Sequence, residues 1–118
     1  MTVYVDDMYL YPLGHFKRGP RTYKMSHMIA DTIAELHAMA EKIGVQRRWF
    51  QDKASGAHYD ITMTKRALAV KAGAVEITLR QCSAMCAVVT RYARPMPHPL
   101  VAEEALMICK QDERDEIA

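Results

Sequence analysis

The sequence carries little net charge and no long apolar run. Its 16 Lys and Arg residues stand against 14 Asp and Glu, so the formal net charge of +2 gives no global electrostatic case for nucleic-acid binding. No window approaches the ~20 apolar residues of a membrane-spanning helix. Acids at positions 6 and 7 interrupt the N-terminus before an apolar signal segment could develop. We therefore expect a soluble, cytoplasmic protein.

Cysteines are few, and familiar sequence motifs are missing. Cys82, Cys86 and Cys109 are odd in number, and the first two lie four residues apart in an expected helix, a poor geometry for a disulfide. No suitable cluster of further cysteines follows them, so we expect buried, free thiols rather than an iron–sulfur or zinc site. The chain also lacks a Gly-rich phosphate loop, a helix-turn-helix, a zinc finger and internal repeats.

What is present fits one compact domain, because half of the 118 residues are apolar. Expected strands alternate with expected helices: strands over 2–5, 45–50 and 74–77, and helices from 31 or 32 to 43, over 65–72 and over 79–92. Such alternation is typical of α/β folds. We predict an α/β fold, a small single-domain layer with a short, mostly parallel sheet flanked by helices. It occupies residues 1–93; residues 94–118 form a Pro-containing linker, a C-terminal helix over 101–111 and an acidic tail that frays.

Two further segments bear on function. Residues 8–24 contain Pro and Gly and are expected to form an exposed loop, in which basic residues alternate with Tyr and Phe. Such a loop could pair with phosphate and stack on a base, or it could simply be solvated. Residues 58–61 are expected to be extended, which places His58 and Asp60 on one face.

Polar residues gather in two clusters, one over residues 24–37 and the other over 58–60. We expect the two clusters to meet in one pocket. The candidate catalytic residues are His27, Asp31, His58 and Asp60. The candidate ligand-binding residues are Asp6, Ser26, His37, Arg48, Tyr59 and Lys65. Asp6 and Asp7 end the first strand, where they could hold a divalent metal or begin a turn.

These residues also carry a family resemblance. At Ser26-His27, Asp31, Glu35-Leu36-His37 and His58-Tyr59-Asp60 the chain resembles a small bacterial and phage family called domain of unknown function 4031, over about residues 1–80. The resemblance implies a shared fold and carries no activity. Asp7 stands where many relatives have proline, which weakens an Asp6–Asp7 metal pair.

Three functions compete for this set of residues. Imidazole and carboxylate groups suit zinc, manganese or iron, and a metal-bound water would make the domain a hydrolase. The same groups, with Arg48 and Lys65, could instead bind a nucleotide or other phosphorylated ligand without turning it over. The third alternative is a phage or host regulatory protein-interaction module, or an oligomer, with structural histidines and with nine methionines and the last helix supplying contacts. We favour the pocket for a nucleotide or other phosphorylated ligand and leave catalysis open; a divalent metal is the candidate cofactor.

Overall fold

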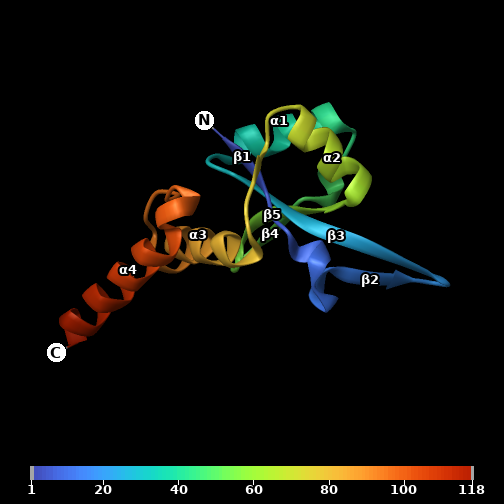
Figure 1. Cartoon of the computed structure of the whole chain (residues 1–118). Coiled ribbons are helices and arrows are strands. Elements are labelled where there is room, and N and C mark those ends of the chain that lie inside the picture. Colours follow the sequence, from blue (N-terminus) through green and yellow to red (C-terminus); the bar gives the residue numbers. More distant parts are fainter. Residues whose placement is uncertain (1, 118) are drawn as a thin grey trace.

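The computed structural model describes residues 2–117, and a six-stranded sheet occupies the first two thirds of this range (Figure 1). The strand order is β4-β5-β3-β1-β6, and β2 pairs with β3 outside this path. The strands are β1 (Val3–Val5), β2 (His15–Arg18), β3 (Arg21–Ala30), β4 (Gln51–Lys53), β5 (Gly56–Thr62) and β6 (Val75–Glu76).

The long strand β3 sets the direction of the sheet. It runs antiparallel to β1, β2 and β5, and β4 is antiparallel to β5. Among the described strands only β1 and β6 pair in parallel. The fold is therefore a mixed α/β domain with a mostly antiparallel sheet, and the prediction of a mostly parallel sheet is wrong. The sheet is mostly antiparallel because short connections return the chain in the opposite direction. A parallel arrangement needs a long crossover, such as the one through α2 that leads from β5 to β6.

Much of the error comes from residues 8–24. They form two short 3₁₀ turns and then a hairpin, β2 with the first part of β3, which turns at Gly19 and Pro20. Gly19 has a φ of +62°, a conformation that glycine adopts at no steric cost. The Gly-Pro pair that indicated a loop is in fact the turn of a hairpin.

Residues 2–117 contain four helices, α1 (Ile33–Ile43), α2 (Met63–Lys71), α3 (Leu79–Tyr92) and α4 (Ala102–Ile117); the first three pack on the sheet and α4 packs on α3. Local signals set their ends. Thr32 caps α1 by accepting a hydrogen bond from the Glu35 N–H, and Gly44 closes it with a φ of +80°. Thr78 and Gln81 form a reciprocal capping box at the start of α3, whose predicted bounds are confirmed.

Other boundaries differ from the prediction. Residues 45–50 are not a strand, because Arg47–Trp49 form a 3₁₀ turn that leads into β4. The charged segment 112–116, expected to fray, belongs to α4. Two contacts explain its order: Arg94 lies 2.9 Å from Asp112, and the Tyr92 hydroxyl donates to Glu113 at 2.8 Å.

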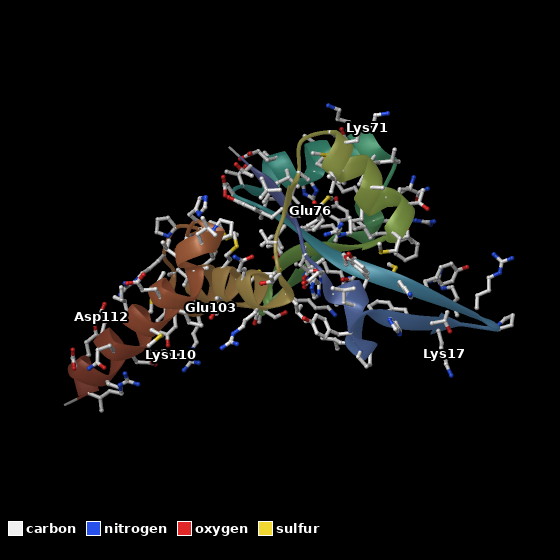
Figure 2. The ribbon with its side chains drawn as sticks, viewed as in Figure 1. Lys17, Lys71, Glu76, Glu103, Lys110 and Asp112 are labelled. Carbon is white, nitrogen blue, oxygen red and sulfur yellow. The ribbon has the colours of Figure 1, made fainter. Side chains whose placement is uncertain are left out.

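The two faces of the sheet carry different layers. Alternate residues such as Val5, Met28 and Tyr59 pack with α1 and α2. On the other face, Tyr4 and Ile29 pack against α3 and the start of α4. The hairpin carrying Lys17 and the end of α4 lie at opposite ends of a molecule measuring 52 × 30 × 24 Å (Figure 2). Within the described range, no helix combines the length and the apolar character needed to cross a membrane.

Candidate metal centre

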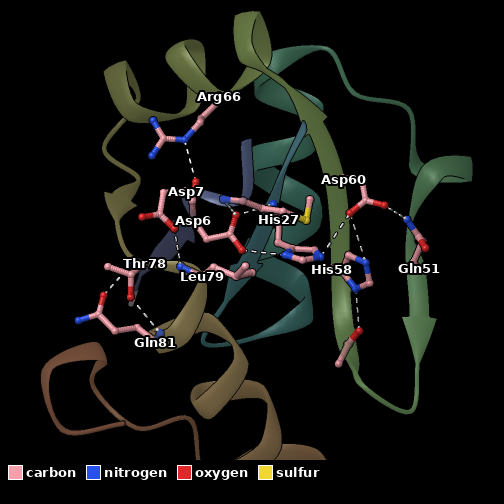
Figure 3. Close-up of polar contacts among 12 residues, drawn as sticks. Asp6, Asp7, His27, Gln51, His58, Asp60, Arg66, Thr78, Leu79 and Gln81 are labelled. Carbon is pink, nitrogen blue, oxygen red and sulfur yellow. Dashed lines mark hydrogen bonds and ion pairs between the residues drawn. The ribbon is translucent and has the colours of Figure 1, made fainter. Parts of the chain in front are cut away.

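Strand alternation and register bring four polar side chains to the α3 face of the sheet. Asp6 follows β1 directly, His27 lies on β3, and His58 and Asp60 lie two residues apart on β5. His27 is the direct cross-strand partner of Asp60, and the backbone N–H of Asp6 donates to the His27 carbonyl at 3.0 Å. Direct partners on neighbouring strands point to the same side, so the four side chains form a row across the sheet (Figure 3).

The carboxylate of Asp6 is fully buried and fixes His27. One oxygen accepts from the backbone N–H groups of His27 and Met8, at 2.9 and 3.1 Å. The other lies 2.7 Å from Nδ1 of His27. Behind it, the Arg66 guanidinium donates to the Asp6 carbonyl at 2.9 Å and pairs with Glu76 at 2.9 Å. The Asp6 carboxylate thus accepts three hydrogen bonds, two on one oxygen and one on the other.

These contacts decide which imidazole nitrogens carry protons. A carboxylate cannot donate, so Nδ1 of His27 donates to Asp6 and the neutral ring has its lone pair on Nε2. Nδ1 of His58 lies 2.9 Å from the Gly56 carbonyl, which likewise only accepts, so its lone pair is also on Nε2. The two rings meet edge-on with centroids 5.1 Å apart.

Both lone pairs face the same oxygen of Asp60. Oδ1 of Asp60 lies 3.8 Å from Nε2 of His27 and 3.5 Å from Nε2 of His58. The other oxygen accepts from the Gln51 amide at 2.6 Å, whereas Oδ1 is buried and has no hydrogen-bond partner within residues 2–117. The ligand atoms of these three residues lie within 4.8 Å of one another. Three acceptors facing one another need a cation between them, either a proton or a metal ion.

The charges around His27 favour its cationic form. Burial opposes protonation, but the hydrogen bond and charge of Asp6, together with the charge of Asp60, outweigh it and raise the His27 pKa above 6.5. The same negative field would favour a bound metal cation over an empty site.

Two thiols approach from α3. Cys82 is buried and Cys86 is half-buried, and both are free. The hydrogen bond from Cys82 lowers the pKa of the Cys86 thiol, assisted by the charge of His27, and the same bond raises the pKa of Cys82. Asp6, His27 and Cys82 form a second group with metal-ligand spacing. This group is the weaker candidate, because Asp6 already holds the His27 nitrogen that faces it.

A groove of about 650 Å³ opens beside Asp60. Its walls are the β2–β3 hairpin, the turn before β4 and the start of α2, and Asp60, which faces the two histidines, and Gln51 also line it. The other lining residues include Phe16, Lys17, Arg18, Tyr23, Trp49 and Lys65.

A family model described as a protein of unknown function, DUF4031, matches residues 3–89. The chain belongs to the DUF4031 family. No curated protein and no solved structure gives a significant match. The match confirms the resemblance given by the sequence and covers the whole row from Asp6 to Asp60 together with most of α3.

In this DUF4031 domain the candidate residues divide into two groups. His27, His58 and Asp60 come together, with Asp6 behind them. Asp31 does not join them, because it lies four residues beyond His27, ~13 Å along the chain direction. Its carboxylate accepts from the Thr2 N–H and the Tyr4 hydroxyl.

The remaining candidates lie outside the row. Ser26 and Tyr59 are buried on the opposite face of the sheet, where the Tyr59 hydroxyl lies 2.7 Å from Nδ1 of His37. Arg48 is exposed, with its guanidinium 5.0 Å from the Trp49 ring centroid. Lys65 lines the groove and donates to the Ile43 carbonyl at 2.9 Å.

Sequence reasoning missed Gln51 and underrated the thiols. Gln51 is not among the candidate residues, yet it lies on β4 as the direct partner of His58. Only that pairing brings its amide to Asp60. The four-residue spacing of Cys82 and Cys86 did indicate a shared helix face, but nothing local says that this face lies over His27.

Proposed function

We propose that this DUF4031 domain is a metal-dependent hydrolase of a phosphorylated ligand, with His27, His58 and Asp60 as the metal ligands. The observation that carries the proposal is the convergence of the Nε2 lone pairs of two neutral imidazoles on a buried carboxylate oxygen that has no hydrogen-bond partner within residues 2–117. Both Nδ1 atoms are engaged elsewhere, so each ring presents a ligand atom without rearrangement. Asp6 acts as the outer carboxylate that orients a metal-binding histidine.

Two histidines and one carboxylate leave coordination positions open, as catalytic metal sites do. Zinc, manganese and iron(II) all suit this ligand set. A metal ion held by these residues would lower the pKa of a bound water toward neutral and so supply a nucleophile. The groove that begins at Asp60 would deliver the ligand to that position.

The lining of the groove supports an anionic ligand. Arg18 and Lys65 line it, and Asp60, at the metal end, is the single carboxylate among the lining residues. A phosphoryl group would therefore meet cationic side chains on one side and the metal centre on the other. A nucleotide and a phosphosugar both fit this description.

The test is metal binding by protein stripped with a chelator. We expect one equivalent of Zn²⁺ or Mn²⁺ by calorimetry, and loss of at least tenfold in affinity in His58→Gln and in Asp60→Asn. His15→Gln is the matched control, because His15 is exposed on the hairpin and contacts the Tyr9 carbonyl. A wild type that binds no metal, or a His58→Gln variant that binds it equally well, would overturn the proposal. Metal-loaded protein is then assayed for release of phosphate and for cleavage of phosphodiesters.

The second candidate function is a protein-interaction or oligomer-forming module. It is favoured by exposed apolar side chains on the 3₁₀ turn Pro99–Val101 and on α4, namely Leu100, Val101, Met107, Ile108 and Ile117. Two results together would favour this module over the hydrolase. The protein would sediment in a concentration-dependent way that Ile108→Lys abolishes, and it would neither bind metal nor hydrolyse phosphoesters.

A further inference from the structure

We infer that the groove beside Asp60 binds a nucleotide unit, with the base among three aromatic rings and the phosphate toward the metal centre. The inference rests on the proposed function and names its ligand class as a nucleobase joined to a phosphate. A free nucleotide and one residue of a single-stranded nucleic acid share this chemistry, and the experiment below separates them.

The aromatic residues of the groove come from two segments far apart in sequence. Phe16 and Tyr23 are direct cross-strand partners on the hairpin, and Trp49 ends the 3₁₀ turn before β4. Their exposed fractions are 38%, 37% and 48%, although each ring lines a concave surface. Rings left open to solvent in a groove are available to stack on a base, which any of the four nucleobases can satisfy.

Cations accompany these rings. The Arg18 guanidinium lies 5.9 Å from the Trp49 ring centroid, and that of Arg48 lies 5.0 Å from it. Guanidinium planes stack on bases as well as on indole, so a base could replace Arg18 on the Trp49 ring or stack on the Arg18 guanidinium. Lys65 uses one N–H on the Ile43 carbonyl and keeps the others for a phosphate.

Position and size agree with this ligand. The volume of about 650 Å³ lies within the ~300–1,000 Å³ usual for small-molecule sites. Asp60 lines the groove together with the three rings, and Asp60 is a proposed metal ligand. A phosphate attached to a base on Trp49 would therefore point along the groove toward the proposed catalytic position.

Trp49 is the single tryptophan of the chain, so its fluorescence reports on the groove alone. We would titrate chelator-treated protein with nucleoside monophosphates, a trinucleotide of single-stranded DNA and ribose 5-phosphate. We expect the nucleotides to change the fluorescence and to bind at least tenfold more tightly than ribose 5-phosphate. Equal affinity for mononucleotide and trinucleotide would identify a free nucleotide as the ligand; tighter binding of the trinucleotide would identify single-stranded nucleic acid.

Variants then locate the base. Tyr23→Ala should weaken nucleotide binding by roughly 5- to 100-fold, the range for losing one stacked base. Tyr11→Ala is the control, because Tyr11 is an exposed aromatic outside the groove lining and should leave affinity unchanged. Any one of three results would overturn the inference: equal affinity for ribose 5-phosphate and nucleotides, no fluorescence response to any nucleotide, or unchanged nucleotide binding by folded Tyr23→Ala.

The two proposals can fail separately. If the metal-free protein binds nucleotide but takes up no added metal, the proposed metal centre is refuted and the groove assignment stands. Stoichiometric metal binding without any nucleotide response would refute the groove assignment alone.

Discussion

Replacing Asp6 by Asn should lower metal affinity without changing a proposed metal ligand. In the wild type one Asp6 oxygen accepts two backbone N–H groups and the other accepts the His27 Nδ1 proton. An asparagine can keep the first set of bonds only by turning its NH₂ group toward His27. Nδ1 must then accept, so the neutral ring carries its proton on Nε2, the atom that faces Asp60.

The magnitudes follow from these contacts. Loss of an outer partner of a metal-binding histidine lowers metal affinity by ~10- to 100-fold, which equals ~1.4–2.8 kcal/mol. The metal-free variant also loses a buried, charge-assisted hydrogen bond worth ~1.5–3 kcal/mol at pH values where His27 is protonated. Asp6 is fully buried, so solvent screening does not reduce this figure.

The assay is competition against a chromophoric chelator, with thermal unfolding in parallel and ¹⁵N NMR of the His27 ring to read its tautomer. Asp31→Asn is the matched control, because Asp31 also accepts two hydrogen bonds but lies away from the row. The reasoning is refuted if folded Asp6→Asn binds metal like the wild type, or if Asp31→Asn loses as much affinity.

Three further predictions concern pH, backbone and thiols. Folding raises the pKa of His27 above its ordinary value of 6.5, so protonated His27 stabilises the metal-free protein fully below pH 6.5. This stabilisation is lost as pH rises through the folded pKa. A free energy of unfolding that stays constant above pH 6 would contradict this. Gly56→Ala should lower the free energy of unfolding by ~2–5 kcal/mol, because φ is +138° and the new Cβ would lie 2.9 Å from Sγ of Cys86. Gly19→Ala meets no neighbouring atom and should cost only ~1–2 kcal/mol, and equal losses in denaturant titrations would refute the packing argument. Iodoacetamide should label Cys86 before Cys82 in native protein, because Cys86 is less buried and its pKa is lowered by the hydrogen bond from Cys82; mass spectrometry showing equal rates would exclude it.

Features encoded within one turn or one strand could be predicted from the sequence. The predicted end of α1 at residue 43 and both predicted ends of α3 are confirmed, because caps satisfy backbone groups only a few residues away; α1 begins at Ile33, one residue after the later of its two predicted starts. His58 and Asp60 were expected on one face, and β5 places them there, since side chains alternate in any extended segment.

The segment around His27 shows where local reasoning stops. It was interpreted as the approach to α1, and the polar residues from His27 to His37 were grouped as one cluster. Residues 21–30 instead form the longest strand of the sheet, so the two histidines lie on opposite faces. Hydrophobic periodicity was too weak to show this, because the outer half of β3 is exposed in the hairpin.

The sequence by itself therefore determined the bounds of α3, the end of α1, the family and the residue types available for chemistry. Only the tertiary structure decided which of these residues meet. The pairing of His27 with Asp60, the buried carboxylate of Asp6 behind His27 and the amide of Gln51 beside Asp60 all depend on strand register. Register is a non-local property, because it is fixed by burying one face of each strand against helices distant in the chain. A one-residue slip of β3 would turn His27 to the α1 and α2 face and leave the oxygen of Asp60 with the imidazole of His58 alone.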